Sequence, residues 1–137
     1  GMTGAFGLKP GVLHGDILLN LDSEDEGELY VGCAGGTNGN ARFEYSEQPV
    51  PAGYSGFKLQ VTGLKGGHSG IDINLGKGNA IKIMTRILYT GTKDHGVMLA
   101  SIDGGGLRNA IPRESFAVIA IPGNQDSGFR SFLDKIS

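Results

Sequence analysis

The chain of 137 residues is long enough for one domain of ordinary size, or for one domain with a piece of a neighbour. Its formal net charge of -2, with basic residues scattered along the sequence, argues against a general nucleic-acid or membrane-surface binder. No apolar run reaches the roughly 20 residues that cross a bilayer. Hydrophobic residues make up 39% of the sequence, enough for a packed core.

One cysteine and many glycines set the next limits. Cys33 stands alone, which excludes an internal disulfide and a multi-cysteine metal site and favours the reducing cytoplasm. The 25 glycines show no collagen-like period. They cluster between segments that look like strands and helices, where they allow positive φ angles and close approach of a backbone to a ligand. These clusters predict either a site built from loops or simply a fold rich in turns.

Three strands are predicted in the first fifty residues. Residues 16–20 include an Ile-Leu-Leu run that is typical of a strand buried on both faces. Residues 28–34 form a second candidate. In residues 41–46 the aromatic side chains of Phe43 and Tyr45 alternate with charged ones, which indicates a half-buried strand. Residues 48–53, with two prolines, then break regular structure and suit a hinge between two units.

A strand and a helix follow this hinge. Residues 57–61 alternate apolar and polar side chains, so they predict a strand with one exposed face. Residues 79–90 carry apolar side chains at helical spacing. Asn79 is the predicted N-cap of this helix and Gly91 its predicted stop.

The rest of the chain predicts two strands and a last helix. Residues 97–102 and 116–121 are the strands. The helix, with Asp126 or Ser127 as its cap, is indicated by an apolar stripe made of Phe129, Phe132, Leu133 and Ile136. The order β-α-β-β-α predicts an α+β fold, a ferredoxin-like two-layer sandwich whose last strand is missing. We therefore expect the chain to be part of a longer protein.

Three polar residues are candidates for a site. His68 lies in a glycine-rich loop between a predicted strand and helix, where an imidazole can donate a hydrogen bond to a developing oxyanion, or have no task. Asn109, after Gly104-Gly105-Gly106, could orient a substrate carbonyl or carboxylate, or only stabilise a turn. Asp22 follows the end of a predicted buried strand and could bind a divalent metal, or be a solvated loop acid.

Three strings that contain these residues closely resemble one family. They are DILLNLDSEDEGELYVGCAGG at 16–36, GLKGGHSG at 63–70 and LRNAIPRE at 107–114. Together they are similar to the bacterial aminoacyl-histidine dipeptidases, cytosolic Xaa-His dipeptidases with two co-catalytic zinc ions that are related to carnosinases and glutamate carboxypeptidase. The resemblance runs along nearly the whole chain.

The resemblance implies a role for each candidate. Asp22 would be a zinc ligand, and Asn109 a residue that holds the dipeptide substrate. His68 would be the lid histidine that stabilises the tetrahedral oxyanion; in related dimers this histidine reaches the active site of the partner subunit. Residues 1–50 would be a strip of the catalytic domain with one metal-ligand strand. Residues 51–137 would be part of the ferredoxin-like lid, which mediates homodimerisation. The implied reaction is hydrolysis by a zinc-activated water, with a glutamate as general base.

The other residues that such a site requires are not found at the expected places in this sequence. We therefore expect the chain alone to bind little or no zinc and to hydrolyse nothing. The alternative that the sequence leaves open is a free-standing ferredoxin-like module that associates with itself and has no catalytic role.

Overall fold

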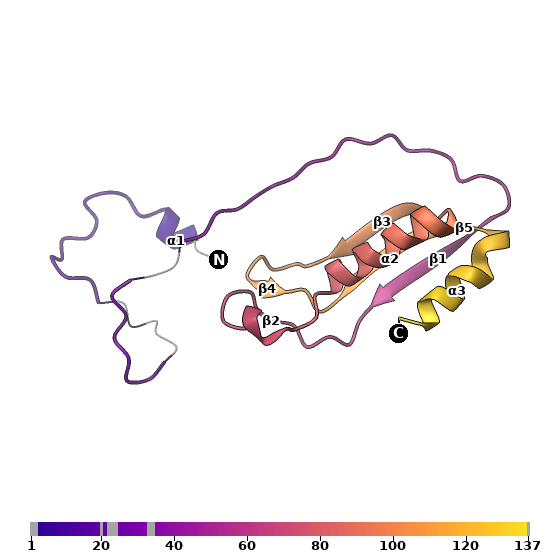
Figure 1. Cartoon of the computed structure of the whole chain (residues 1–137). Coiled ribbons are helices and arrows are strands. Elements are labelled where there is room, and N and C mark those ends of the chain that lie inside the picture. Colours follow the sequence, from indigo (N-terminus) through magenta and orange to yellow (C-terminus); the bar gives the residue numbers. More distant parts are fainter. Residues whose placement is uncertain (1–2, 20, 22–24, 33–34, 137) are drawn as a thin grey trace. The chain divides into compact units, whose positions relative to one another are not determined.

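The computed structural model describes residues 3–19, 21, 25–32 and 35–136, and the chain divides into two compact units (Figure 1). The first unit, Gly1–Glu44, contains one short helix, α1 (Thr3–Phe6). The second, Tyr45–Ser137, contains the sheet and the longer helices. The boundary falls a little before the predicted one at residue 50. None of the described helices has the length and apolar character needed to cross a membrane.

The three strands predicted before the hinge are not formed at the described residues 16–19, 28–32 and 41–46, so the prediction is wrong there, while residues 20, 33 and 34 lie outside the described residues. Their large apolar side chains are exposed: Ile17, Leu18 and Val31 are 81%, 85% and 98% exposed. A strand is stable only when a neighbour satisfies its backbone N–H and C=O groups and covers its apolar face. The described residues of this unit supply neither.

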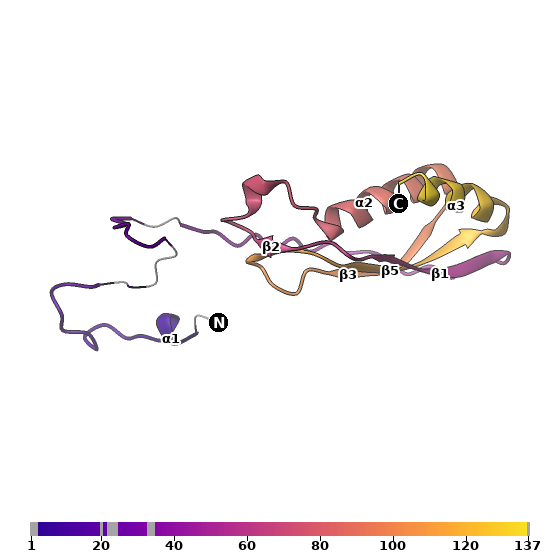
Figure 2. The ribbon, with the colours of Figure 1, turned by 90° about the horizontal axis from the view of Figure 1, so that it is seen from below.

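The second unit is a two-layer α+β sandwich. Strands β1 (Tyr54–Val61), β5 (Ser115–Pro122) and β3 (Met98–Gly104) form an antiparallel sheet in the order β1-β5-β3. Helices α2 (Ala80–His95) and α3 (Asp126–Asp134) cover one face of this sheet (Figure 2). The predicted β-α-β-β-α order and the ferredoxin-like fold are confirmed. Because α2 connects the two outer strands, the central position is left for β5.

Helix α1 was not predicted, and neither were four shorter elements of the second unit. A second, two-stranded sheet pairs β2 (Gly67–His68) with β4 (Ala110–Ile111). The 3-10 turns are η1 (Ile73–Leu75), which precedes α2, and η2 (Gly123–Gln125), which runs directly into α3. Elements of two or three residues are too short to produce a hydrophobic period, so the sequence pattern could not indicate them.

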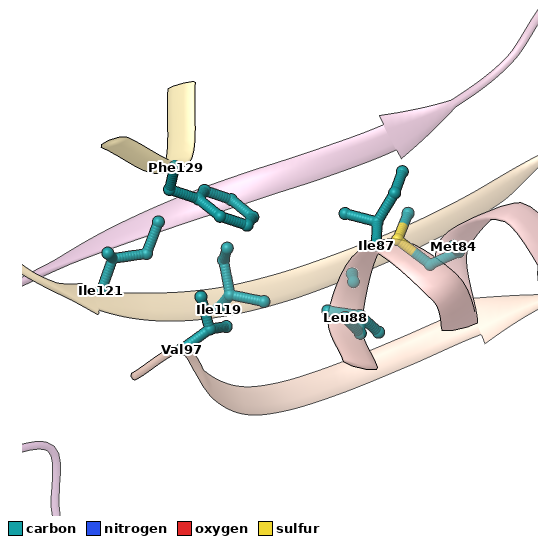
Figure 3. Close-up of a cluster of buried hydrophobic side chains, with 8 residues drawn as sticks. Met84, Ile87, Leu88, Val97, Ile119, Ile121 and Phe129 are labelled. Carbon is teal, nitrogen blue, oxygen red and sulfur yellow. The ribbon is translucent and has the colours of Figure 1, made fainter. Parts of the chain in front are cut away.

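The hydrophobic core lies between the helices and the sheet. Alternate residues of β5 point toward the helices, and the apolar stripe of α2 and one aromatic ring from α3 close over them (Figure 3). Phe129 is the largest of the fully buried side chains, with 1% of its surface exposed. The buried members of this cluster are Met84, Ile87, Leu88, Val97, Ala117, Ile119, Ile121 and Phe129.

The predicted start of α2 is confirmed, but its predicted end is wrong. Asn79 is the N-cap as predicted, and its side-chain oxygen accepts a hydrogen bond of 3.1 Å from the backbone N–H of Lys82. The predicted stop at Gly91 is wrong, because the helix continues to His95. It ends at Gly96, whose φ of 66° is the left-handed conformation that glycine adopts without strain.

The start of α3 has no side-chain cap, so the predicted cap at Asp126 or Ser127 is wrong. Helix α3 continues from the 3-10 turn η2, which supplies the preceding backbone turn in place of a capping side chain. Asp126 is instead the first helical residue, and its carboxylate accepts a hydrogen bond of 2.7 Å from Nε of Arg130 one turn later.

Candidate functional site

The short sheet β2–β4 brings two of the predicted site residues together. His68 lies opposite Ala110 in this sheet. The backbone N–H of Ser69 donates a hydrogen bond of 3.0 Å to the carbonyl oxygen of Asn109. Both His68 and Asn109 are largely accessible to solvent. Two loops far apart in the sequence are therefore joined at the residues that the sequence singled out.

The imidazole of His68 is held by its own loop. Its Nδ1 accepts hydrogen bonds from the backbone N–H groups of Gly70, at 3.1 Å, and Ile71, at 3.2 Å. A ring nitrogen that accepts a hydrogen bond carries no proton, so the neutral ring carries its proton on Nε2. The loop thus leaves His68 as an exposed side chain with an Nε2–H donor, which is the tautomer needed to stabilise a developing negative charge.

An ion pair lies beneath this loop. One carboxylate oxygen of Asp72, Oδ2, accepts a hydrogen bond of 2.8 Å from the backbone N–H of His68 and lies 3.0 Å from Nζ of Lys77. The hydrogen bond with Lys77, followed by that from the N–H of His68, lowers the pKa of the Asp72 carboxyl from its ordinary value of 3.8. No sequence pattern indicated this pair, because the spacing from Asp72 to Lys77 follows neither a helix nor a strand period.

A shallow pocket lies beside β2 and β4. Its volume is about 440 Å³, and glycine backbones make up much of its wall. Two cationic side chains and one anionic side chain are among its lining residues, and the guanidinium Nε of Arg113 lies 3.7 Å from a carboxylate oxygen of Glu114. The lining residues are Lys65, Gly66, Gly67, Gly105, Gly106, Leu107, Ala110, Ile111, Pro112, Arg113 and Glu114.

The third predicted site residue, Asp22, lies outside the residues that the structure describes. Within the described ranges no three His, Cys, Asp or Glu side chains gather into a group that could hold a metal ion. The described residues therefore do not by themselves fit a zinc centre. What they assemble is the pair of loops that carries His68 and Asn109.

Residues 53–136, which include the whole sandwich and both loops, match the family described as the peptidase dimerisation domain. The chain belongs to this family. The match covers most of the second unit, Tyr45–Ser137.

Two relatives of this peptidase dimerisation domain are dipeptidases. The chain is 47% identical over 134 residues to the cytosol non-specific dipeptidase of Escherichia coli strain K12. It also matches the crystal structure of an aminoacylhistidine dipeptidase from Vibrio alginolyticus, with a TM-score of 0.71 and 42% sequence identity. These similarities confirm the predicted resemblance to bacterial dipeptidases.

The matched region is a small part of each relative. The similarity covers 98% of this chain but 28% of the Escherichia coli protein, and 99% of this chain but 29% of the Vibrio alginolyticus protein. The chain therefore spans less than a third of the length of either relative.

Proposed function

We propose that this chain supplies the lid and dimer contacts of a zinc-dependent dipeptidase, and that His68 stabilises the oxyanion formed during peptide hydrolysis. The observation that carries this proposal is the fixed tautomer of His68, whose Nδ1 accepts two backbone hydrogen bonds and leaves Nε2–H as the donor. The family of the second unit and the two dipeptidase relatives support the class of reaction.

The chemistry of the proposed site requires a donor rather than a base at His68. When water attacks a peptide carbonyl, negative charge develops on the carbonyl oxygen, and a preorganised N–H donor lowers the energy of that state. A donor already oriented by Gly70 and Ile71 has no need to reorganise during the reaction. Asn109, joined to the same ladder, would hold the substrate through its side-chain amide.

The metal chemistry belongs to the parent enzyme. Two zinc ions, when bound, would supply the activated water, and Asp22 would be one of their ligands. We expect the chain alone to bind little or no zinc and to be inactive. The parent enzyme would work in the cytoplasm, as the name of the Escherichia coli relative indicates for that protein. Its substrates would be dipeptides of the Xaa-His type, a preference that the name of the Vibrio alginolyticus relative states for that protein and the name of the Escherichia coli relative does not.

Self-association is the second part of the proposal. The family description supports a dimerisation role for the second unit. Strands β1 and β3 are the outer strands of the three-stranded sheet, and an outer strand offers unpaired backbone groups to another chain. We propose a homodimer of the parent enzyme. The alternative function, a self-associating module without catalysis, rests on the same outer strands. Only a measurement of peptidase activity distinguishes it from the dipeptidase proposal.

The test is dipeptide hydrolysis by the full-length protein that contains this chain, with zinc added. Replacing His68 by alanine should lower kcat by about 100- to 1,000-fold, the effect of removing one oxyanion donor. Far-UV circular dichroism should show an unchanged fold. His14→Ala is the matched control, because His14 is an exposed histidine in the first unit. Xaa-His dipeptides compared with other dipeptides would measure the preference.

Each outcome of this test has a definite meaning. Loss of activity in His68→Ala but not in His14→Ala supports the proposed role of the loop. Equal activity in the two variants refutes an oxyanion role for His68 while leaving the dipeptidase class intact. An intact parent protein with no peptidase activity toward any dipeptide would overturn the enzymatic proposal and favour the self-associating module.

A further inference from the structure

We propose that Asp72 and Lys77 are positioning residues, which hold the loop after β2 in the one shape that keeps the proton of His68 on Nε2. This inference rests on the proposed oxyanion role of His68. Neither residue need touch a substrate. Their effect would pass through the backbone of the loop to the imidazole.

The first step of the argument is the closed turn between His68 and Asp72. The carboxylate of Asp72 accepts from the backbone N–H of His68 at 2.8 Å, and the backbone N–H of Asp72 donates to the carbonyl oxygen of His68 at 3.2 Å. The two residues are thus tied at both the N–H and the C=O of His68. Rotation of either peptide group at His68 would break one of these bonds.

The second step concerns the residues between these anchors. Gly70 and Ile71 lie inside the closed turn, and their N–H groups are the two donors to Nδ1 of His68. Since both ends of the turn are tied, the direction of these N–H groups is set by the same bonds that Asp72 makes. A loosened turn would release Nδ1 and allow the other tautomer, with the proton on Nδ1 and no donor on Nε2.

The third step is the close packing of the ion pair against β2. A Cβ atom placed on Gly67 would lie 2.6 Å from Oδ2 of Asp72 and 2.7 Å from Nζ of Lys77. The pair therefore occupies the space that a side chain at Gly67 would need. Gly67 in turn pairs with Ile111 of β4, so the pair packs on the ladder that joins the His68 loop to the Asn109 loop.

The ion pair of Asp72 and Lys77 is better suited to fixing the conformation of the loop than to stabilising the whole fold. The side chains of Lys77 and Asp72 are 26% and 24% exposed, so water and salt screen their attraction only in part. The pKa of the Asp72 carboxyl is lowered by Lys77 and by the N–H of His68, so the carboxylate is charged at neutral pH. One such pair adds little to the stability of a whole domain, but it can select one arrangement of a short loop.

The first experiment reads the tautomer directly on this chain. The ¹⁵N chemical shifts of the neutral His68 imidazole, measured by NMR, distinguish a proton on Nε2 from one on Nδ1. We expect the Nε2–H form in the native chain. Asp72→Asn and Lys77→Met should both shift the population toward the Nδ1–H form. Asp126→Asn is the matched control, because it breaks a comparable ion pair with Arg130 in α3.

The second experiment measures hydrolysis by the full-length protein. Asp72→Asn and Lys77→Met should each lower kcat by about 10-fold, less than His68→Ala, since the donor is misplaced rather than removed. KM should change little, because neither side chain is proposed to hold the substrate. Lys77→Arg, which keeps the positive charge, should retain most of the activity that Lys77→Met loses.

The outcomes separate this inference from the proposed function. If His68→Ala abolishes activity while Asp72→Asn and Lys77→Met leave both kcat and the ¹⁵N shifts unchanged, the positioning role is refuted and the proposed function stands. If His68→Ala leaves kcat unchanged, the proposed oxyanion role of His68 is refuted, and the effect of Asp72 and Lys77 on the tautomer is then decided by the ¹⁵N shifts alone. If one of the variants Asp72→Asn and Lys77→Met fails to fold, the other one is used, because either substitution breaks the same ion pair.

Discussion

Replacing Gly91 by alanine should destabilise the second unit, although Gly91 lies inside a helix. In a helix interior alanine is normally better than glycine by about 1 kcal/mol. At Gly91, however, an added Cβ would lie 3.0 Å from Cε2 of Phe129 and 3.0 Å from Cγ2 of Val97. Optimal carbon–carbon contacts are about 3.5–4.0 Å. The methyl group would therefore force α2 away from α3 or push both neighbours out of place.

The size of the effect follows from these two opposing contributions. Phe129 and Val97 are 1% and 5% exposed, so neither can move aside into solvent. Overpacking of a buried site costs about 1–3 kcal/mol. Subtracting the helix-propensity gain of about 1 kcal/mol leaves a net loss of roughly 1 kcal/mol, the middle of the resulting range. The free energy of unfolding is measured by urea titration, followed by far-UV circular dichroism.

Gly128→Ala is the matched control for this prediction. Gly128 also lies in a helix, but a Cβ there would lie 3.6 Å from the His95 ring, an ordinary van der Waals distance. This variant should therefore stabilise by a few tenths of a kcal/mol to about 1 kcal/mol. The double variant Gly91→Ala/Val97→Ala should be more stable than the sum of its single effects predicts, because the smaller side chain removes the close contact with Cγ2 of Val97. The packing argument fails if Gly91→Ala stabilises as much as Gly128→Ala.

Two further predictions concern an N-cap and an ionisation. Asn79→Ala should lower the free energy of unfolding by about 1 kcal/mol, because the N–H of Lys82 loses its side-chain acceptor. Urea titration measures this value, and an unchanged free energy of unfolding would refute the prediction. The folded-state pKa of Asp72 is lowered, so the bond from the N–H of His68 is fully present above the ordinary value of 3.8 and is lost as the pH falls through the lowered value. The NMR shift of the His68 amide should therefore titrate with a midpoint below 3.8, and Asp72→Asn should lack that step.

The regular part of the fold could be predicted because its hydrophobic periods are long. The stripe of α2 and the alternation of β1 span enough residues for a period to be recognised, and the structure places both where the pattern indicated. Gly91 shows the limit of this approach. A glycine that ends a helix and a glycine that admits a neighbouring ring are the same letter in the sequence, and only the packing of Phe129 distinguishes them.

The candidate site could be predicted only in part. His68 and Asn109 were singled out, and the structure joins their loops through a ladder of two residues on each strand. The ion pair of Asp72 and Lys77 was missed, because it arises from a closed turn and a 3-10 turn rather than from any period. The strands predicted before residue 50 failed for another reason, since a strand pattern predicts only a preference and pairing depends on a partner.

The shortness of the β2–β4 ladder means that the two loops are joined by only a small part of the free energy that holds the second unit together. Local opening in proteins can occur at free energies far below that of global unfolding. The ladder can therefore break and reform while the core around Phe129 stays folded. A ligand that contacts both loops adds its binding free energy to the small free energy of the ladder. The fraction of molecules with the two loops joined therefore depends on ligand concentration as well as on sequence.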